Sequence, residues 1–335
     1  MKSVTYVRIL KCNLCLVLHI DRGSLFRISW VRALFLMLLT VYCLLPTCAI
    51  AQGQAGSDIA VLRAGVGARP LGMGSAFTAV ADNADAPYWN PAGLSSITKS
   101  EIITTQTKLS TDADHYYVSY VFPLKRGAIG ISWIQIGMGT ITQTTTTDAF
   151  NEVITTGAFS YFSNAYLLSY GLPVNPNISV GLTAKYLTSD MFQIAGGQAY
   201  GYSVTPGILL KLAVNKGQWA VGAKVDELIN QQNWGTGTVE KVPPVARLGL
   251  AYKTPNPGLF AIDISQVLKS TYATEISVGY EWAKDGLSLR LGYMDNGLTV
   301  GAGFISGQAR VDYAYVTQRD LSKENVHRVS LSGFF

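Results

Sequence analysis

GLSLRLGYMDNG (residues 286–297) alternates apolar and polar side chains with a period of two. In a β-strand, side chains two positions apart share a face. One face would carry Leu287, Leu289, Leu291 and Tyr293. The other would carry Ser288, Arg290 and Gly292. The stretch ends in Asn296-Gly297, a turn signal, so it predicts a strand with one apolar and one polar face.

The same rhythm recurs along the chain, for example in TEISVGYEW (274–282), ARVDYAYV (309–316) and SVGLTAKYL (179–187). Fourteen such segments are expected, at 99–108, 114–124, 126–138, 157–170, 177–188, 198–213, 216–225, 241–253, 257–268, 272–283, 285–296, 298–306, 307–318 and 325–335. Connections after even-numbered segments are short turns. Those after odd-numbered segments include three long ones, which we expect to be loops, at 139–156, 189–197 and 226–240. An even strand number with this asymmetry is typical of an outer-membrane barrel.

Composition favours a membrane barrel over a soluble sandwich or barrel. Charged residues make up only 14% of the chain, whereas Gly (33) and Tyr (18) are plentiful; soluble domains carry about 25% charge. Aromatic residues also recur near the ends of the segments, where a membrane interface would place them. We therefore predict an all-β protein, a 14-stranded antiparallel transmembrane β-barrel in the bacterial outer membrane, with the lipid bilayer and the barrel insertion machinery as partners.

Residues 1–51 differ from the rest and are predicted to be a cleaved signal peptide, with 1–25 as an upstream extension from a misannotated start. Arg27 and Arg32 precede an uncharged run that ends in Ala49-Ile50-Ala51. A retained anchor and a lipoprotein modified at Cys48 are the alternatives. This region holds all four cysteines, six of the 26 Lys/Arg and one of the 21 Asp/Glu. The remainder carries 20 of each charge, so its net charge of zero gives no reason to expect a nucleic-acid partner.

The polar faces of the segments carry charged residues that we expect to line the lumen. They are Lys185, Arg247, Asp263, Glu275, Glu281, Arg290, Arg310, Asp312 and Arg328. A catalytic carboxylate pair is the alternative. However, the chain after residue 51 has only two histidines and no nucleophile elbow, phosphate loop or HExxH pair. We expect no enzyme activity, no cofactor and no metal site.

Residues 52–98, before the first strand, are rich in Gly and Ala and are expected to fold back into the lumen as a plug on the periplasmic side. Gly72 and Gly74 permit close backbone packing, and Asn90-Pro91 favours a turn. Irregular backbone at membrane depth is tolerated only inside protein or a wet cavity. Arg69 is a candidate partner for Asp82 and Asp85, which either latch the plug or cap turns. Trp89 is expected to pack within it.

AGVGARPLGMGSAFTAVADNADAPYWNPAGLSSI (64–97) resembles the N-terminal signature of the PorV/PorQ family of outer-membrane proteins, which is similar to the FadL-type transporters. LRLGYMDNGLTVGAGFISGQARVDYAYV (289–316) and the ending HRVSLSGFF also resemble that family. The resemblance implies a FadL-like 14-stranded barrel with an N-terminal hatch, in which the side chain of Asn90 caps backbone groups. Independently of the resemblance, the terminal strand ending in Phe335 is expected to be the signal that the barrel insertion machinery reads.

Two functions follow from the resemblance. The first is a component of a type IX-like secretion system that binds or shuttles secreted proteins, or caps a translocon, through its long outer loops. The alternative is a FadL-like channel for uptake of hydrophobic small molecules. A channel of that kind would need a gap in the barrel wall, for which Gly137 and Gly139 are the candidate positions.

Overall fold

The structure is a computed structural model of the whole chain. It describes residues 59–109, 113–147, 153–214, 217–269, 273–294, 297–317 and 325–335. The predicted signal peptide and the first residues of the predicted plug lie outside these ranges. Both therefore stay predictions.

The described chain after residue 100 is almost entirely strand. The strands are β1 (Glu101–Lys108), β2 (Asp114–Pro123), β3 (Ala128–Thr147), β4 (Val153–Pro173), β5 (Ile178–Phe192), β6 (Gln198–Val214), β7 (Gly217–Asp226), β8 (Ile229–Trp234), β9 (Val239–Glu240), β10 (Val245–Lys253), β11 (Gly258–Val267), β12 (Glu275–Lys284), β13 (Leu287–Met294), β14 (Gly297–Ser306), β15 (Ala309–Val316) and β16 (Val326–Phe334).

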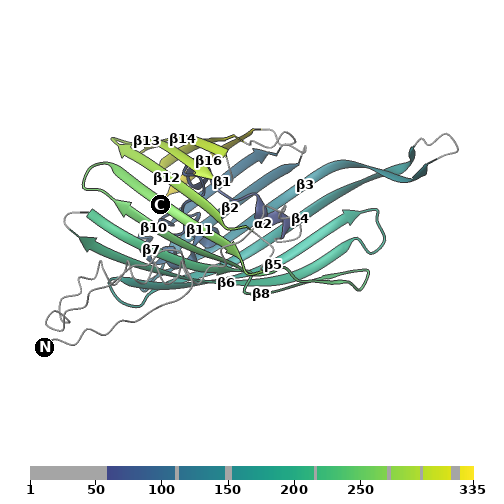
Figure 1. Cartoon of the computed structure of the whole chain (residues 1–335), viewed down its shortest axis with the longest axis horizontal. Helices are drawn as coiled ribbons and strands as arrows, with labels where there is room; N and C mark the ends of the chain where they lie inside the picture. Colours follow the sequence, from purple (N-terminus) through teal and green to yellow (C-terminus); the bar gives the residue numbers. More distant parts are fainter. Residues whose placement is uncertain are drawn as a thin grey trace, which may run out of the picture. The chain divides into compact units, whose positions relative to one another are not determined.

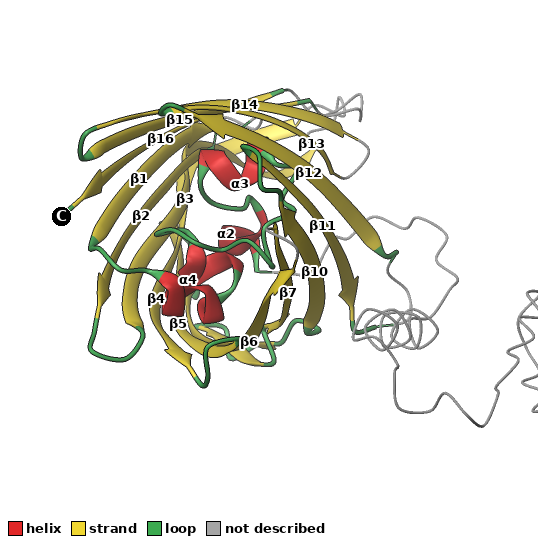
Figure 2. Cartoon of the chain, turned by 90° about the vertical axis from the view of Figure 1, so that its left-hand side faces the viewer, coloured by secondary structure: helices red, strands yellow, loops and turns green. Residues whose placement is uncertain are grey.

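Fourteen of these strands form one closed antiparallel barrel, seen side-on in Figure 1 and from one end in Figure 2. Strands β1 to β7 pair in sequence order, β7 pairs with β10, and β10 to β16 continue the order. The ring closes where β1 pairs with β16, from Glu101 opposite Phe334 to Thr107 opposite Arg328. The predicted fold class is confirmed, and each barrel strand overlaps one of the fourteen predicted segments.

The structure corrects the prediction of three long loops, because most of the described residues in 139–156, 189–197 and 226–240 belong to strands. Residues 139–147 and 153–156 extend β3 and β4 into a hairpin that projects beyond the barrel (Figure 1). Strand β5 runs on to Phe192, and residues 226–240 contain β8, which pairs with β6, and β9, which pairs with β8. The hairpin is rich in threonine, and β-branched residues favour strands over loops.

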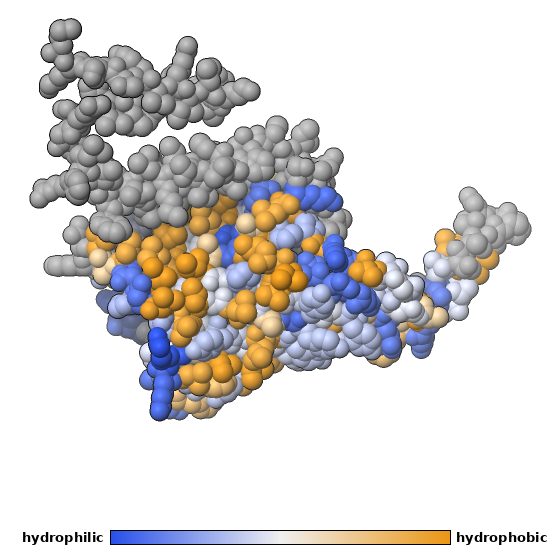
Figure 3. All heavy atoms as spheres, turned by 90° about the horizontal axis from the view of Figure 1, so that it is seen from below, coloured by the Kyte–Doolittle hydropathy of each residue, from blue (hydrophilic) through white to orange (hydrophobic). Residues whose placement is uncertain are grey.

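The barrel is apolar outside and polar inside. On β13, the outward Leu289 and Leu291 are 50% and 55% exposed, whereas the inward Arg290 between them is 4% exposed. The same alternation runs through β1, β2, β15 and β16. Apolar spheres accordingly cover much of the outer surface in Figure 3. An apolar exterior around a polar interior is the pattern of a barrel in lipid.

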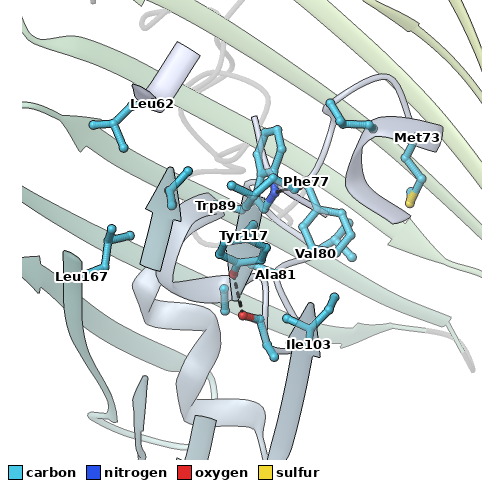
Figure 4. Packing of buried hydrophobic residues seen from close by; sticks show 14 of the residues in the cluster. Leu62, Met73, Phe77, Val80, Ala81, Trp89, Ile103, Tyr117 and Leu167 are labelled. Carbon is cyan, nitrogen blue, oxygen red and sulfur yellow. Dashed lines mark hydrogen bonds between the residues drawn. The ribbon is translucent and has the colours of Figure 1, made fainter. Parts of the chain in front are cut away.

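Residues 59–97, the plug segment, lie inside the barrel. They form three short helices, α2 (Ala60–Arg63), α3 (Ala68–Gly72) and α4 (Ala86–Trp89), and a 3-10 helix, η1 (Pro91–Ser96). Helix α3 contacts β13 to β16, and η1 contacts β3 to β6, on the opposite side of the ring. Figure 2 shows these helices within the ring of strands, and Figure 4 shows plug side chains such as Phe77 and Trp89 packed with Tyr117 and Ile103 of the wall. The hydrophobic core is therefore the interface between plug segment and wall.

Candidate functional site

A buried arginine joins the plug segment to the barrel wall. Arg69 in α3 donates through Nε and Nη2 to the two carboxylate oxygens of Glu281 on β12, at 2.8 Å each. Its Nη1 pairs with Asp82, further along the plug segment. Although burial lowers it, the two carboxylates raise the pKa of Arg69, so the guanidinium stays charged. Two parallel bonds to one carboxylate fix both the position and the orientation of the arginine.

The pairing continues along the wall. Arg290 on β13 donates through Nε to Glu281 at 2.7 Å, and its Nη1 lies 2.9 Å from Asp312 on β15. Asp312 lies 2.6 Å from Nε of Arg310. The resulting charge chain alternates in sign in the order Asp82, Arg69, Glu281, Arg290, Asp312 and Arg310. Its three positive and three negative charges balance. All except Asp82, whose side chain is 43% exposed, are buried, and buried charges require such pairing.

A second charged cluster lies on β5, β7 and β10. Lys224 Nζ is 2.9 Å from Asp226 and also donates to the backbone oxygen of Tyr88 at 2.8 Å. Arg247 Nε is 3.2 Å from Asp226, and Lys185 Nζ is 2.5 Å from Glu227. Lys185 and Arg247 are among the predicted lumen charges, whereas their partners Glu227 and Asp226 are not. The period-two pattern of β7 would have placed Lys224 and Asp226 on the inward face.

Two predicted lumen charges bind plug backbone rather than an opposite charge. Asp263 on β11 accepts hydrogen bonds from the N–H groups of Phe77 and Thr78, at 3.0 and 2.9 Å. Arg328 on β16 donates to the carbonyls of Gly65 and Ala64, at 2.7 and 3.1 Å. Both side chains thereby satisfy backbone groups that the irregular plug segment would otherwise leave unpaired.

Inward-facing glycines of the strands let the plug backbone lie directly on the wall. A Cβ at Gly181 on β5 would come within 2.5 Å of the carbonyl oxygen of Pro91, and a Cβ at Gly279 on β12 would lie 2.9 Å from Cβ of Met73. Other inward glycines that face the plug segment are Gly130, Gly171, Gly207, Gly222, Gly249, Gly292 and Gly301. Because the plug segment lies directly on these glycines, their positions on the strands follow its course along the inner wall.

The Asn90-Pro91 turn is held by its own side chain. Asn90 Oδ1 accepts from the N–H of Ala92 at 3.1 Å and so caps η1, while Pro91 occupies the first position of that helix. Asn90 Nδ2 donates to the carbonyls of Thr78, at 2.8 Å, and of Ile208 on β6, at 3.1 Å. One side chain thus ties together two parts of the plug segment and the wall.

Trp89 and the two predicted glycines pack within the plug segment or against the wall. Trp89 is 2% exposed, donates through Nε1 to the carbonyl of Val66 at 3.0 Å, and meets Phe77 edge-on. Gly72 faces Gly301, and Gly74, with a φ of 62°, faces the backbone of β12 and β13. A side chain at Gly74 would be strained and would meet backbone on both strands.

Asp85 is fully buried without a direct ionic partner among the described residues. Its Oδ2 accepts a hydrogen bond from Asn83 at 2.8 Å, and its Oδ1 accepts none from the described residues. Burial raises the pKa of Asp85 from 3.8 to about 6, with Asp312 adding to the rise and Asn83 opposing it. Of the two acids considered as latches, Asp82 therefore pairs with Arg69 and Asp85 does not.

Two further predicted residues lie apart from these contacts. Glu275 is partly buried at the start of β12, and Phe335 is 72% exposed at the end of the chain, with its N–H donating to Ser100 at 2.9 Å. The part of Phe335 in insertion stays a prediction.

A cavity of about 280 Å³ lies between the start of the plug segment and the wall. Its apolar lining is Ile59, Tyr161, Met191, Trp234 and Val242. Its polar lining is Ser163, Ser189, Asn230, Gln231, Gln232 and Glu240. The β8–β9 hairpin, which lies in one of the predicted long loops, supplies Trp234 and Gln232.

The wall is continuous at Gly137, one of the two candidate gap positions. Gly137 pairs with Asp114 on β2 and with Phe162 on β4. The first shift of the β3–β4 register lies between Met138 and Ile141, a stretch that includes Gly139, and two more follow between Gln143 and Thr147; all three lie beyond Gly137, the last residue of β3 that pairs with β2. The irregularity at Gly139 therefore belongs to the projecting hairpin and not to the closed part of the barrel.

Within the described ranges, no helix is long and apolar enough to cross a membrane. The same part of the chain holds no group of three or more His, Cys, Asp or Glu residues placed to bind a metal ion.

Comparison with solved structures shows several similar barrels. A monoaromatic hydrocarbon channel, the TodX deltaS2S3 mutant, is 15% identical with a TM-score of 0.58, over 81% of this chain and 99% of that chain. The P. putida toluene transporter TodX is 13% identical with a TM-score of 0.59, over the same shares. A Pseudomonas aeruginosa FadL homologue is 11% identical with a TM-score of 0.52, over 80% and 98%. No family model matches the sequence, and comparison with curated proteins gives no match.

These comparisons correct the main functional prediction. The solved structures with this fold carry the names of hydrocarbon channels and of a FadL homologue, so the PorV/PorQ-type secretion function is the wrong choice of the two. The plug signature that suggested it describes how residues 64–97 pack inside the barrel, and packing of this kind does not distinguish the two functions. The fold of this chain is that of the FadL-type barrels.

Proposed function

We propose that this protein is an outer-membrane channel for small hydrophobic molecules. The FadL-like fold, the apolar exterior and the packed plug segment support this proposal. The cavity between Ile59 and the β8–β9 hairpin carries it, because it is the place where a ligand would meet the plug segment.

Aromatic side chains mark where the barrel would sit in a membrane. One outward cross-strand row contains Trp133, Tyr166, Tyr186 and Tyr202 on β3 to β6. A second contains Trp219, Tyr252, Phe260 and Tyr280 on β7 and β10 to β12, near the opposite end of the barrel. Aromatic belts at both interfaces are typical of outer-membrane barrels.

The apolar band between the belts suits a bilayer. On β5, the outward positions from Ile178 to Tyr186 are Ile178, Val180, Leu182, Ala184 and Tyr186. At roughly 3.3 Å per residue and a strand tilt of about 40°, this stretch spans roughly 20 Å of height. The bacterial outer membrane is thinner than an average bilayer, so a band of this height supports outer-membrane localisation.

The cavity suits a small ligand that is mainly apolar. Its volume of about 280 Å³ is just below the roughly 300–1,000 Å³ typical of ligand pockets. Trp234, Met191 and Tyr161 offer an apolar and aromatic surface on one side, and Ile59 closes the other. A ligand could pass from the cavity further into the barrel only if residues of the plug segment moved, because these residues and the inner wall form one buried cluster.

Fluorescence quenching of Trp234 tests the proposal. Bromobenzene, a small aromatic heavy-atom quencher, is titrated into the detergent-solubilised protein and into the variants Trp234→Phe and Trp282→Phe. We expect saturable quenching in the wild type and in Trp282→Phe, whose indole lies on β12 away from the cavity, and its loss in Trp234→Phe. Quenching that does not saturate, or that is equal in the two variants, contradicts a ligand site at the cavity.

A further inference from the structure

The outward face of β2 to β6 carries an apolar groove of about 580 Å³. The side chains that line it are mainly aromatic or aliphatic, with Tyr120, Ile131, Tyr166, Leu168, Tyr186 and Tyr202 each at least 39% exposed. Lys185 also borders the groove, but its ammonium turns inward to Glu227. The groove thus presents an apolar and aromatic surface at the level of the aromatic row formed by Trp133, Tyr166, Tyr186 and Tyr202.

A strip of uncharged polar side chains lies directly beyond the aromatic row, toward the projecting hairpin. Gln135, Asn164 and Thr188 are cross-strand neighbours on β3, β4 and β5. Each stands two positions beyond an aromatic residue of the row, namely Trp133, Tyr166 and Tyr186. We call Gln135, Asn164 and Thr188 the amide strip.

The amide strip is ordered by its own hydrogen bonds. Asn164 Oδ1 accepts from Gln135 Nε2 at 2.9 Å and from Trp133 Nε1 at 3.1 Å, and Asn164 Nδ2 lies 3.4 Å from Thr188 Oγ1. A side-chain amide has two donors and a two-lone-pair acceptor. These contacts use part of that capacity and hold the groups in a fixed array along the barrel surface.

Groove and strip together form an amphipathic site. An acyl chain in the groove would place its headgroup at the amide strip, because the aromatic row separates the two surfaces. The strip has no cationic side chain, so its chemistry does not select a phosphate, which is bound chiefly by Arg and Lys. Amides and a hydroxyl that both donate and accept are suited to a headgroup made of hydroxyls.

We propose that the groove and the amide strip bind a glycolipid, with an acyl chain in the groove and the sugar hydroxyls on Gln135, Asn164 and Thr188. This inference rests on the membrane placement that accompanies the proposed function, and not on the cavity. It assigns to the outer wall a lipid site that is separate from the ligand site inside the barrel.

The test measures lipid binding to the detergent-solubilised protein by native mass spectrometry. The probes are dioleoyl monogalactosyl glycerol, dioleoyl phosphatidylcholine and dioleoyl phosphatidylglycerol, which share acyl chains and differ in headgroup. We expect the galactolipid to bind about tenfold more tightly than either phospholipid, which corresponds to one or two additional hydrogen bonds. The double variant Gln135→Ala/Asn164→Ala should lose this preference, and Tyr186→Ala should weaken all three lipids.

Gln218→Ala is the matched control, because it removes an exposed amide at the other end of the barrel, on β7, and should keep the preference. Equal binding of the three lipids, preference for a phospholipid, or an unchanged preference in the double variant overturns the proposal. A dimer mass with no bound lipid also overturns it, since a second copy would then cover the groove. Bromobenzene quenching through Trp234 is measured on the same samples, so failure of the channel proposal is distinguished from failure of the lipid site.

Discussion

Opposite walls of the barrel hold the plug segment in different ways. On β12, β13 and β15, α3 is fixed by the charge chain through Arg69 and Glu281. On β4 to β6, η1 lies on glycines and is held by hydrogen bonds of Asn90 to Ile208, of Ser95 to Ser179 and of Ser96 to the ammonium of Lys211. Because η1 has no charged residue, no ion pair joins it to this side, which we call the neutral wall. The charged wall holds α3 only while every charge of the balanced set is present. The neutral wall holds η1 only while its glycines carry no side chain. The two walls should therefore respond to opposite kinds of substitution.

The largest expected effect is on the charged wall. Glu281→Ala leaves Arg69 and Arg290 buried with fewer partners, and breaking a buried ion pair costs about 3–5 kcal/mol. The free energy of opening of residues 59–97, measured by hydrogen exchange with the barrel strands as internal reference, should fall by that amount. Asp114→Ala, at an exposed position at the start of β2, is the control. Equal effects of the two variants would show that the charge chain does not hold the plug segment.

On the neutral wall, η1 has no charged residue whose removal could loosen it. Adding one methyl group to a glycine under η1 should loosen it instead. Gly181→Ala forces a Cβ against the backbone of Pro91 and Ala92, and such overpacking costs about 1–3 kcal/mol or more. The same exchange measurement should show loosening that begins at η1. Gly139→Ala is matched to it, because a Cβ there meets no atom within 4 Å. Wild-type protection in Gly181→Ala would mean that η1 can shift at no cost, and the comparison of the walls would fail.

A pH titration probes Asp85, a buried carboxylate without a direct ionic partner among the described residues. The folded-state pKa of Asp85 is raised from 3.8 to about 6, so its stabilising contribution is full below pH 4 and is lost as the pH rises through about 6. The shift corresponds to about 2–3 kcal/mol weaker holding of the plug segment at pH 8 than at pH 4. Opening free energies corrected for intrinsic exchange should show this fall. Asp85→Asn should remove the part of the fall that Asp85 contributes, about 2–3 kcal/mol, and an undiminished fall in that variant would assign it to other groups.

The smallest effect is expected at the turn. Asn90→Ala removes the η1 cap and the donor to Thr78 and Ile208, at a cost of about 1–2 kcal/mol. Asn90→Asp keeps the cap oxygen but not the donor, so it separates the two contributions. If Asn90→Asp matches the wild type in hydrogen exchange, the bond to the wall contributes nothing.

Much of the barrel could be predicted from sequence because a period of two is a local property. Leu289 and Arg290 reveal their faces without knowledge of any partner strand. The lumen position of Asp312 follows in the same way. Pairings across the barrel are different: that Arg69 meets Glu281, 212 residues away, depends on how deeply the plug segment enters the ring. The path over Gly181 and Gly279 likewise requires the closed structure.

The β8–β9 hairpin shows a second limit of sequence reasoning. Residues 226–240 lack an extended alternating pattern, and β8 is stable as a strand because β6 continues beyond the end of β7 and offers free backbone groups. Trp234 thereby becomes part of the cavity wall. The secretion function was wrongly predicted for a related reason. A plug signature indicates packing inside a barrel and does not identify what the barrel binds or transports.

The seam between β1 and β16 links the closure of the barrel to the start of the plug segment. The plug segment leads directly into β1, and Arg328 binds the carbonyls of Gly65 and Ala64 while its own strand, β16, pairs with β1. Separating β16 from β1 would therefore draw Arg328 away from Gly65 and Ala64. Opening of the seam and release of the first described residues of the plug segment are for this reason linked.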